Sequence, residues 1–210
     1  MKSLGNIGII GDSYSTYEGY NENYRSYYGP SRNFLNGINC VQQIWWHIVL
    51  METKSKLRIN CSHSGSCVCY TSYGGEICKE SSFIERTKVH FSKNIFDTIF
   101  LFGGTNDSWA NSPIGNVKYE LWNEDDLKSF LPSVCFLCDY LKKKQPQSRI
   151  IYIINSDLKD EITNGIIKVC NHYNIDFLLL HDIEKENNHP NIKGMKSIAN
   201  QIIHFLNDHP

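Results

Sequence analysis

Short apolar segments alternate with longer amphipathic ones along the whole chain, and this alternation constrains the fold more than any other feature. Residues 95–102 form an almost continuous apolar run, which is typical of a strand buried on both faces of a parallel sheet. Residues 125–144 repeat their apolar side chains every three or four positions, which indicates a helix that packs by one face. Such patterns predict strands at residues 6–11, 56–61, 95–102, 149–154 and 175–180, and helices at residues 41–52, 81–90, 125–144, 161–173 and 192–206.

This order of elements predicts an α/β protein, because a helix that follows each strand can return the chain to start a parallel neighbour. Right-handed crossovers favour a flavodoxin-like, three-layer α/β/α sandwich around a five-stranded parallel sheet. The length of 210 residues suits one domain spanning residues 1–210. The Tyr-rich segment 17–39 and the segments 62–75 and 103–122 are predicted to be irregular, since they are rich in turn-forming residues.

Charge and hydropathy exclude several classes of partner. The net charge is -1, and no block of like charges suggests binding to nucleic acid or to a membrane surface. The first apolar run lacks the cleavage-site pattern of a signal peptide, and no later segment reaches the roughly 20 apolar residues that a membrane span needs. We therefore expect a cytoplasmic protein that acts on a small molecule, although a chain whose leader had been removed would look the same.

The eight cysteines are expected to be reduced thiols, because a chain of this length needs no disulfides to fold. Cys135 and Cys138 have the spacing of a metal or redox pair, but they fall within the apolar pattern of a predicted helix, which favours packing. A denser group lies in the middle of the chain, with His63 nearby, and lacks the spacing of common zinc modules: Cys61, Cys67, Cys69 and Cys78. No metal or cofactor is expected, and a thiol- or metal-dependent protein is the alternative.

Polar residues with complementary chemistry follow the predicted strands. Ser13 comes directly after the first strand and His189 precedes the last helix. A serine becomes a nucleophile when a histidine takes its proton, and an acid that binds the other imidazole nitrogen fixes the histidine. Glu186, three residues before His189, could be that acid, with Asp182 as the second candidate.

Attack on a carbonyl carbon also requires donors for the negative oxygen that forms. The backbone N–H of Ser13, the backbone N–H of Gly65 and the side-chain amide of Asn106 are suitable donors. Each follows a different predicted strand, and the carboxyl ends of parallel strands meet at one edge of a sheet. These residues are therefore expected to form one site.

Four segments together resemble the SGNH or GDSL-type hydrolase family. They are Gly11-Asp12-Ser13-Tyr14-Ser15, Ser64-Gly65, Gly103-Gly104-Thr105-Asn106-Asp107 and His189-Pro190-Asn191, in this order between residues 6 and 206. The resemblance implies that Ser13 is the nucleophile, that Gly65 and Asn106 help to form the oxyanion hole, and that His189 is the base. Members of the family usually carry an aspartate where this chain has Glu186, so the acid remains open between Glu186 and Asp182. The Gly-x-Ser-x-Gly motif of the α/β-hydrolases is absent around Ser13.

The function expected from the resemblance is that of a serine esterase that hydrolyses carboxylic esters through an acyl-enzyme. Tyr14 and Trp109 lie close in sequence to the candidate site, and their rings could bind substrate. We expect a small acyl group, such as acetyl, on a carbohydrate-like or other small alcohol. The alternatives are a lipid or short-chain acyl esterase or a thioesterase of the same family, and a non-catalytic ligand-binding domain on this scaffold. The sequence leaves the oligomeric state open.

Overall fold

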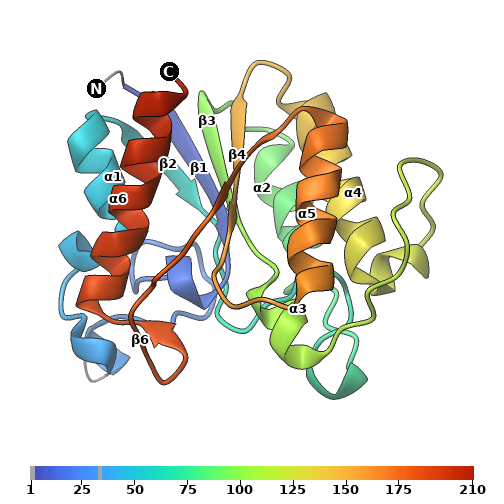
Figure 1. Cartoon of the computed structure of the whole chain (residues 1–210), viewed down its shortest axis with the longest axis horizontal. Helices are drawn as coiled ribbons and strands as arrows, with labels where there is room; N and C mark the ends of the chain where they lie inside the picture. Colours follow the sequence, from blue (N-terminus) through green and yellow to red (C-terminus); the bar gives the residue numbers. More distant parts are fainter. Residues whose placement is uncertain (1–2, 33–34) are drawn as a thin grey trace.

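The structure is a computed structural model that describes residues 3–32 and 35–210. A five-stranded sheet runs through its centre, with the order β2-β1-β3-β4-β5 and every neighbouring pair parallel (Figure 1). The strands are β1 (Asn6–Gly11), β2 (Lys56–Asn60), β3 (Thr98–Phe102), β4 (Arg149–Ile154) and β5 (Asp176–Leu179). This strand order is that of flavodoxin-like folds and confirms the predicted α/β class.

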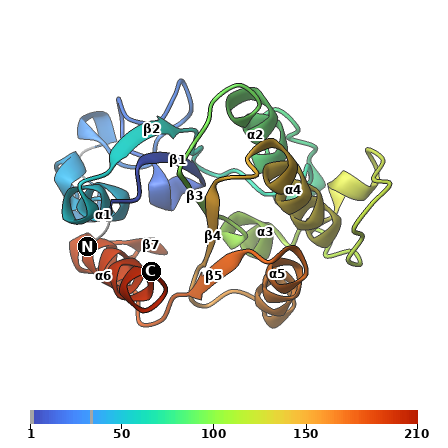
Figure 2. The ribbon, with the colours of Figure 1, turned by 90° about the horizontal axis from the view of Figure 1, so that it is seen from above.

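Helices cover both faces of the sheet, as the view from above shows (Figure 2). One face carries α1 (Trp45–Thr53) and α6 (Ile192–Asp208), which pack against each other. The other face carries α2 (Phe83–Phe91), α4 (Phe130–Lys144) and α5 (Asp160–Tyr173). The three layers therefore have the predicted arrangement.

The central strand β3 shows how the sequence builds the two cores. All five of its residues are buried, and successive side chains of a strand point to opposite faces. Phe100 and Phe102 pack into the core beneath α1 and α6, whereas Ile99 and Leu101 pack into the core beneath α4 and α5. A continuous apolar run is required here because helices cover both faces of the sheet.

Several boundaries differ from the prediction. The strand β3 begins at Thr98 rather than at residue 95, and helices start late as well. α1 begins at Trp45, after a short 3-10 turn η4 (Val41–Gln43). α4 begins at Phe130, after the 3-10 turn η6 (Asp126–Lys128), because Ser129 adopts an extended conformation. The backbone N–H of Phe130 donates to the Pro113 carbonyl at 2.7 Å, which ties this helix start to a distant loop.

Two segments outside the predicted strands and helices contain short elements that their sequences do not indicate. The segment after β3 includes the helix α3 (Thr105–Ala110), which is too short to show an apolar repeat. The polar segment before α6 includes the two short strands β6 (Lys185–Glu186) and β7 (His189–Pro190), which pair antiparallel. The Tyr-rich segment 17–39 is irregular apart from the 3-10 turns η2 (Pro30–Arg32) and η3 (Leu35–Gly37), and its residues 33–34 lie outside the described residues.

All eight cysteines carry free thiols. Cys135 and Cys138 on α4 are fully buried in the core together with Cys170 on α5, as their helical spacing predicts. Within residues 3–32 and 35–210, no group of His, Cys, Asp or Glu side chains could hold a metal ion. The same residues include no helix with the length and hydropathy needed to cross a membrane.

Candidate active site

The candidate nucleophile Ser13 lies just beyond the carboxyl end of β1. The strand runs into the 3-10 turn η1 (Ser13–Ser15), and Asp12 caps this turn by accepting a hydrogen bond from the Tyr14 N–H at 3.0 Å. Gly11 cannot carry a side chain, because a Cβ there would lie 2.6 Å from the hydroxyl oxygens of Ser15 and Ser62. Close packing around Gly11 therefore fixes the turn that presents Ser13.

The candidate base His189 reaches Ser13 from the other end of the chain. His189 Nε2 lies 2.9 Å from Ser13 Oγ, although 176 residues separate the two in sequence. His189 begins β7, which is joined to β6 by a two-residue turn, Asn187-Asn188, whose φ angles are 48° and 61°. Positive φ at both central residues is the mark of a type I′ hairpin turn, for which asparagine is well suited. The structure therefore brings together the two residues that the sequence pairs.

The structure does not bring either acid candidate, Glu186 or Asp182, into contact with His189. Glu186 is exposed, and its Oε1 accepts a hydrogen bond from Asn191 Nδ2 at 3.1 Å. Asp182 is exposed as well, and its Oδ2 lies 3.0 Å from Nδ1 of the adjacent His181. The tight turn after Glu186 places a backbone group at the imidazole instead of the glutamate carboxylate.

The group at His189 Nδ1 is the backbone carbonyl of Asn187, at 2.9 Å. A carbonyl oxygen can only accept a hydrogen bond, so Nδ1 must carry the proton and Nε2 is left with its lone pair toward Ser13. The Asn187-Asn188 dipeptide is the sequence signal that could have predicted this turn.

Side chains from the Tyr-rich segment and η1 hold the β6–β7 hairpin. The Tyr14 hydroxyl donates to the Asn188 carbonyl at 2.5 Å, and the Tyr28 hydroxyl donates to the Pro190 carbonyl at 2.7 Å. Asn36 Nδ2 donates to the carbonyls of Glu186 and His189, both at 2.7 Å. The long irregular segment therefore positions the candidate base.

Three aromatic rings surround the imidazole of His189. Tyr27 stacks on it, with the ring centroids 3.6 Å apart and the planes 4° from parallel. Trp109 of α3 and Tyr14 make further ring contacts, at 5.7 Å and 5.4 Å between centroids. Burial lowers the pKa of His189 below the ordinary value of 6.5, which favours the neutral form that a base requires.

The two aromatic residues expected to bind substrate have different settings. Tyr14 is fully buried, its hydroxyl donates to the hairpin, and its ring lies beside the imidazole of His189, with the centroids 5.4 Å apart. Trp109 is only half-buried, in edge contact with Tyr14 and close to His189. Of the two, only Trp109 has ring surface left for a ligand.

The candidate oxyanion donor Asn106 lies in the first turn of α3, directly after β3. Gly104 caps this helix with a φ of +102°, in the left-handed region that favours glycine. Asn106 is only 2% exposed, and its Nδ2 has no hydrogen-bond partner within the described residues. A buried amide group without a partner is costly and therefore unusual in a folded protein.

The second candidate donor, Gly65, lies in the loop after β2. Its φ is +87°, and a Cβ placed on it would meet nothing within 4 Å, so its backbone borders open space. The Asp107 carboxylate of α3 accepts hydrogen bonds from the N–H groups of Val68 and Cys69 in the same loop, at 2.9 Å and 3.2 Å. This contact ties the loop to the helix that carries Asn106.

A buried cation supports the same loop, and the sequence patterns did not single it out. Arg86 of α2 is fully buried, and its guanidinium donates to the Cys61 carbonyl and, at 2.7 Å, to Ser66 Oγ. Its Nε donates to the Ser81 carbonyl at 3.0 Å. Arg86 therefore holds both sides of the segment that contains Gly65. Only its place within an apolar helix pattern could have suggested burial.

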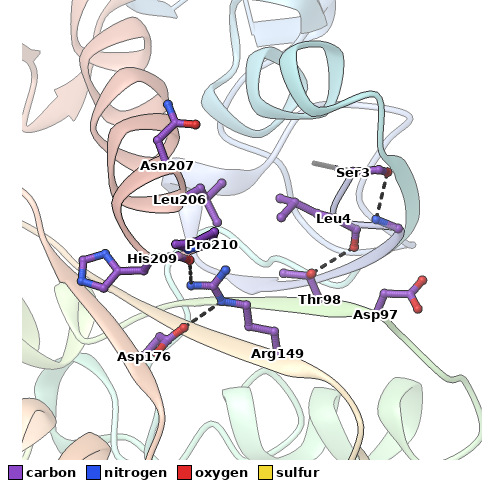
Figure 3. Close-up of a pocket in the computed structure, with 11 residues that line it drawn as sticks. Ser3, Leu4, Asp97, Thr98, Arg149, Asp176, Leu206, Asn207, His209 and Pro210 are labelled. Carbon is purple, nitrogen blue, oxygen red and sulfur yellow. Dashed lines mark hydrogen bonds and ion pairs between the residues drawn. The ribbon is translucent and has the colours of Figure 1, made fainter. Parts of the chain in front are cut away.

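A separate cavity lies at the amino ends of the strands, among residues that include Thr98, Arg149 and Asp176 (Figure 3). Ser13 follows the carboxyl end of β1, at the opposite edge of the sheet. Arg149, which lines this cavity, is already bound by the Asp176 carboxylate at 2.8 Å and by the His209 carbonyl at 2.6 Å. The serine, the histidine and the candidate oxyanion donors follow the carboxyl ends of the strands instead, where ligands bind in open α/β folds.

Comparisons with known proteins agree with this geometry. The model of the family described as GDSL-like Lipase/Acylhydrolase matches residues 5–206. A protein from Bacteroides ovatus ATCC 8483, described as a GDSL-like lipase, is 41% identical with a TM-score of 0.93, over 99% of this chain and 100% of that one. Another so described, from Bacteroides uniformis ATCC 8492, is 38% identical with a TM-score of 0.93, over 97% and 96%.

A more distant structure shares the fold. An acetyl xylan esterase from the rumen bacterium Butyrivibrio proteoclasticus has a TM-score of 0.63 at 19% identity, over 100% of this chain and 64% of that one. No curated protein matches the sequence. The family match over nearly the whole chain confirms what the four motifs predict: the chain belongs to the GDSL-like lipase/acylhydrolase family of hydrolases.

Proposed function

We propose that the protein is a serine esterase that hydrolyses small acyl esters, acetyl esters in the first place, of a carbohydrate-like or other small alcohol. The observation that carries this proposal is the 2.9 Å contact between Ser13 Oγ and His189 Nε2. Nδ2 of the buried Asn106, which has no partner among residues 3–32 and 35–210, adds a donor at the same edge of the sheet. A nucleophile, a base and an oxyanion donor are the groups that acyl transfer needs.

In the proposed mechanism, His189 Nε2 takes the proton of Ser13 as Oγ attacks the ester carbonyl carbon. The developing oxyanion is bound by Asn106 Nδ2 and by the backbone N–H groups of Ser13 and Gly65. His189 then gives its proton to the leaving alcohol, and the acyl group stays on Ser13. Water, deprotonated by His189, releases the acid and restores the enzyme.

The Asn187 carbonyl takes the place in this mechanism that a carboxylate occupies in a Ser-His-Asp triad. It holds the imidazole in the tautomer that leaves Nε2 free, through the 2.9 Å contact with Nδ1. A neutral carbonyl stabilises the imidazolium less than a carboxylate does, because it carries only a partial charge. The stacked ring of Tyr27, which faces the imidazole at 3.6 Å, adds an attractive cation–π contact once the imidazole is protonated.

The substrate class rests on the aromatic side chains beside the reactive groups. Trp109 is half-buried next to His189, and the Tyr73 side chain, 44% exposed, is bonded to Asn106. Aromatic faces of this kind can stack on a sugar ring. The likeness in fold to an acetyl xylan esterase supports the same class of ester.

Hydrolysis of p-nitrophenyl acetate by the wild type and by Ser13→Ala tests the reaction. We expect turnover by the wild type and its loss in the variant, with an unchanged thermal unfolding curve. Equal activity in the two proteins would refute the assignment.

A panel of acetylated sugars, short acyl esters and long acyl esters tests the substrate. We expect acetyl esters to be preferred. Much faster turnover of long-chain esters would instead favour a lipid esterase of the same family.

A further inference from the structure

Tyr73 lies at the tip of a small turn in the loop after β2. The turn is closed by an antiparallel bridge between Thr71 and Ile77 and by a hydrogen bond from the Ser72 N–H to the Glu76 carbonyl at 2.8 Å. The residues that follow Tyr73 are two glycines with positive φ, which complete the 3-10 turn η5 (Tyr73–Gly75). The backbone of Tyr73 is thus held in place while its side chain extends toward α3.

The hydroxyl of Tyr73 donates to Asn106 Oδ1 at 2.8 Å. The opposite end of the same amide, Nδ2, is buried and has no partner within the described residues. The two ends of an amide group point in different directions, so a bond that fixes the oxygen also fixes where the N–H groups point. In the orientation observed, Oδ1 is taken by Tyr73 and Nδ2 is the end of Asn106 left without a partner within the described residues.

The reverse orientation of the amide would be harmful. It would turn Oδ1 toward the site, where an oxygen would repel the developing oxyanion. Nδ2 would then donate to the Tyr73 oxygen, and the Tyr73 proton would need an acceptor other than Oδ1. Burial, with Cys67, Asp12 and Asp107 nearby, raises the pKa of Tyr73 to about 12, so the hydroxyl keeps this proton at neutral pH.

We propose that Tyr73 is a positioning residue for the oxyanion hole: its hydroxyl holds the Asn106 amide with Nδ2 directed at the substrate oxygen. This inference rests on the proposed function, because it assumes that Asn106 binds an oxyanion. Tyr73 touches Asn106 and acts through it, so its contribution should disappear when Asn106 is replaced.

A double-mutant cycle on the rate of phosphonylation by a fluorophosphonate probe tests this inference. The probe reacts with an activated serine and develops negative charge on its oxygen, so its rate reports the oxyanion hole without knowledge of the natural substrate. The proteins compared are the wild type, Tyr73→Phe, Asn106→Ala and the double variant. Tyr173→Phe is a matched control, since it loses a hydroxyl that donates to the Tyr119 carbonyl.

We expect Asn106→Ala to slow labelling by about 100-fold or more. Tyr73→Phe should slow it by roughly tenfold, the effect of one hydrogen bond, and should not slow Asn106→Ala further. Tyr173→Phe should react like the wild type. With p-nitrophenyl acetate, Tyr73→Phe should lower kcat and leave KM nearly unchanged, because the amide acts on the transition state.

Two results would overturn the inference while leaving the proposed function in place. One is wild-type reactivity in Tyr73→Phe alongside a slow Asn106→Ala. The other is an equal loss from Tyr73→Phe with and without Asn106, which would mean that the hydroxyl acts by some route other than the amide. Failure of the wild type to be labelled at Ser13 would instead overturn the proposed function, and this inference with it.

Discussion

Replacing Glu186 by glutamine tests how His189 is held. The carboxylate of Glu186 is exposed and contacts Asn191 Nδ2 at 3.1 Å, whereas Nδ1 of His189 faces the Asn187 carbonyl at 2.9 Å. Glutamine removes the charge but keeps the length of the side chain and an oxygen that can accept the same hydrogen bond. The substitution thus removes a triad acid if Glu186 is one, and otherwise changes little.

The structure sets the size of the expected effect on stability. Asn191 also donates to Glu184 Oε1 at 2.7 Å, and its own Oδ1 caps α6 by accepting from the Gly194 N–H at 3.0 Å. Both bonds survive the substitution, so the free energy of unfolding should change by no more than about 0.5 kcal/mol, as for other surface replacements.

The expected effect on activity follows from the same contacts. Because Nδ1 keeps its carbonyl partner, kcat should stay within about twofold of the wild type, which corresponds to less than 0.5 kcal/mol of activation free energy. Loss of a true triad carboxylate by conversion to its amide lowers kcat by about 10⁴ in the serine proteases that serve as the reference. The two accounts therefore differ by more than three orders of magnitude in a single rate.

The assay is kcat for p-nitrophenyl acetate across the pH range in which His189 is neutral. Two replacements of Asn187 in the hairpin turn are compared in the same assay. Asn187→Gly keeps the positive φ of 48° and should stay active, whereas Asn187→Val disfavours that conformation and should displace the carbonyl from Nδ1. A fall of about 1,000-fold or more in Glu186→Gln would refute the assignment of this role to the carbonyl.

Three further predictions concern the base and its surroundings. The value of kcat/KM should rise with pH, with a midpoint below pH 6.5, because burial lowers the pKa of His189 and only the neutral imidazole can accept the proton. A midpoint above pH 7 would contradict this prediction. Arg86→Met should lower the free energy of unfolding in urea by about 3 kcal/mol, since it leaves the Cys61 carbonyl and Ser66 Oγ without their buried donor. A decrease of less than about 1 kcal/mol would contradict the role given to Arg86. Gly104→Ala should cost about 1–2 kcal/mol of stability, because alanine at a φ of +102° is strained and its Cβ would lie 3.3 Å from Ile162 and Ile166; unchanged stability would show that the backbone relaxes there.

The parts of the fold that the sequence predicts best are those where burial alone dictates residue type. β4 matches its predicted range, 149–154, at both ends, because the five residues after Arg149 are all buried and form one run of isoleucines and a tyrosine. The predicted start of α4 is too early, because the helix begins only at Phe130, whose N–H donates to the Pro113 carbonyl of a separate loop. Local apolar spacing carries no information about such a contact.

The candidate site likewise includes residues that the sequence predicts and contacts that it does not. Ser13, Gly65, Asn106 and His189 could be placed together because each follows a strand or precedes a helix that the pattern predicts. The partner of His189 Nδ1 could not, because it depends on a turn in which Asn187 has positive φ and a backbone carbonyl replaces a side chain. The role of Tyr73 was hidden for a related reason: a hydroxyl bond across 33 residues leaves no periodic trace in the sequence.

The central claim is that His189 makes Ser13 a nucleophile, and mass spectrometry of the intact protein after fluorophosphonate treatment tests it most directly. The account predicts one adduct on the wild type, mapped to Ser13, no adduct on Ser13→Ala, and greatly slowed labelling of His189→Ala. An adduct at another residue, or labelling of His189→Ala at the wild-type rate, would contradict the account.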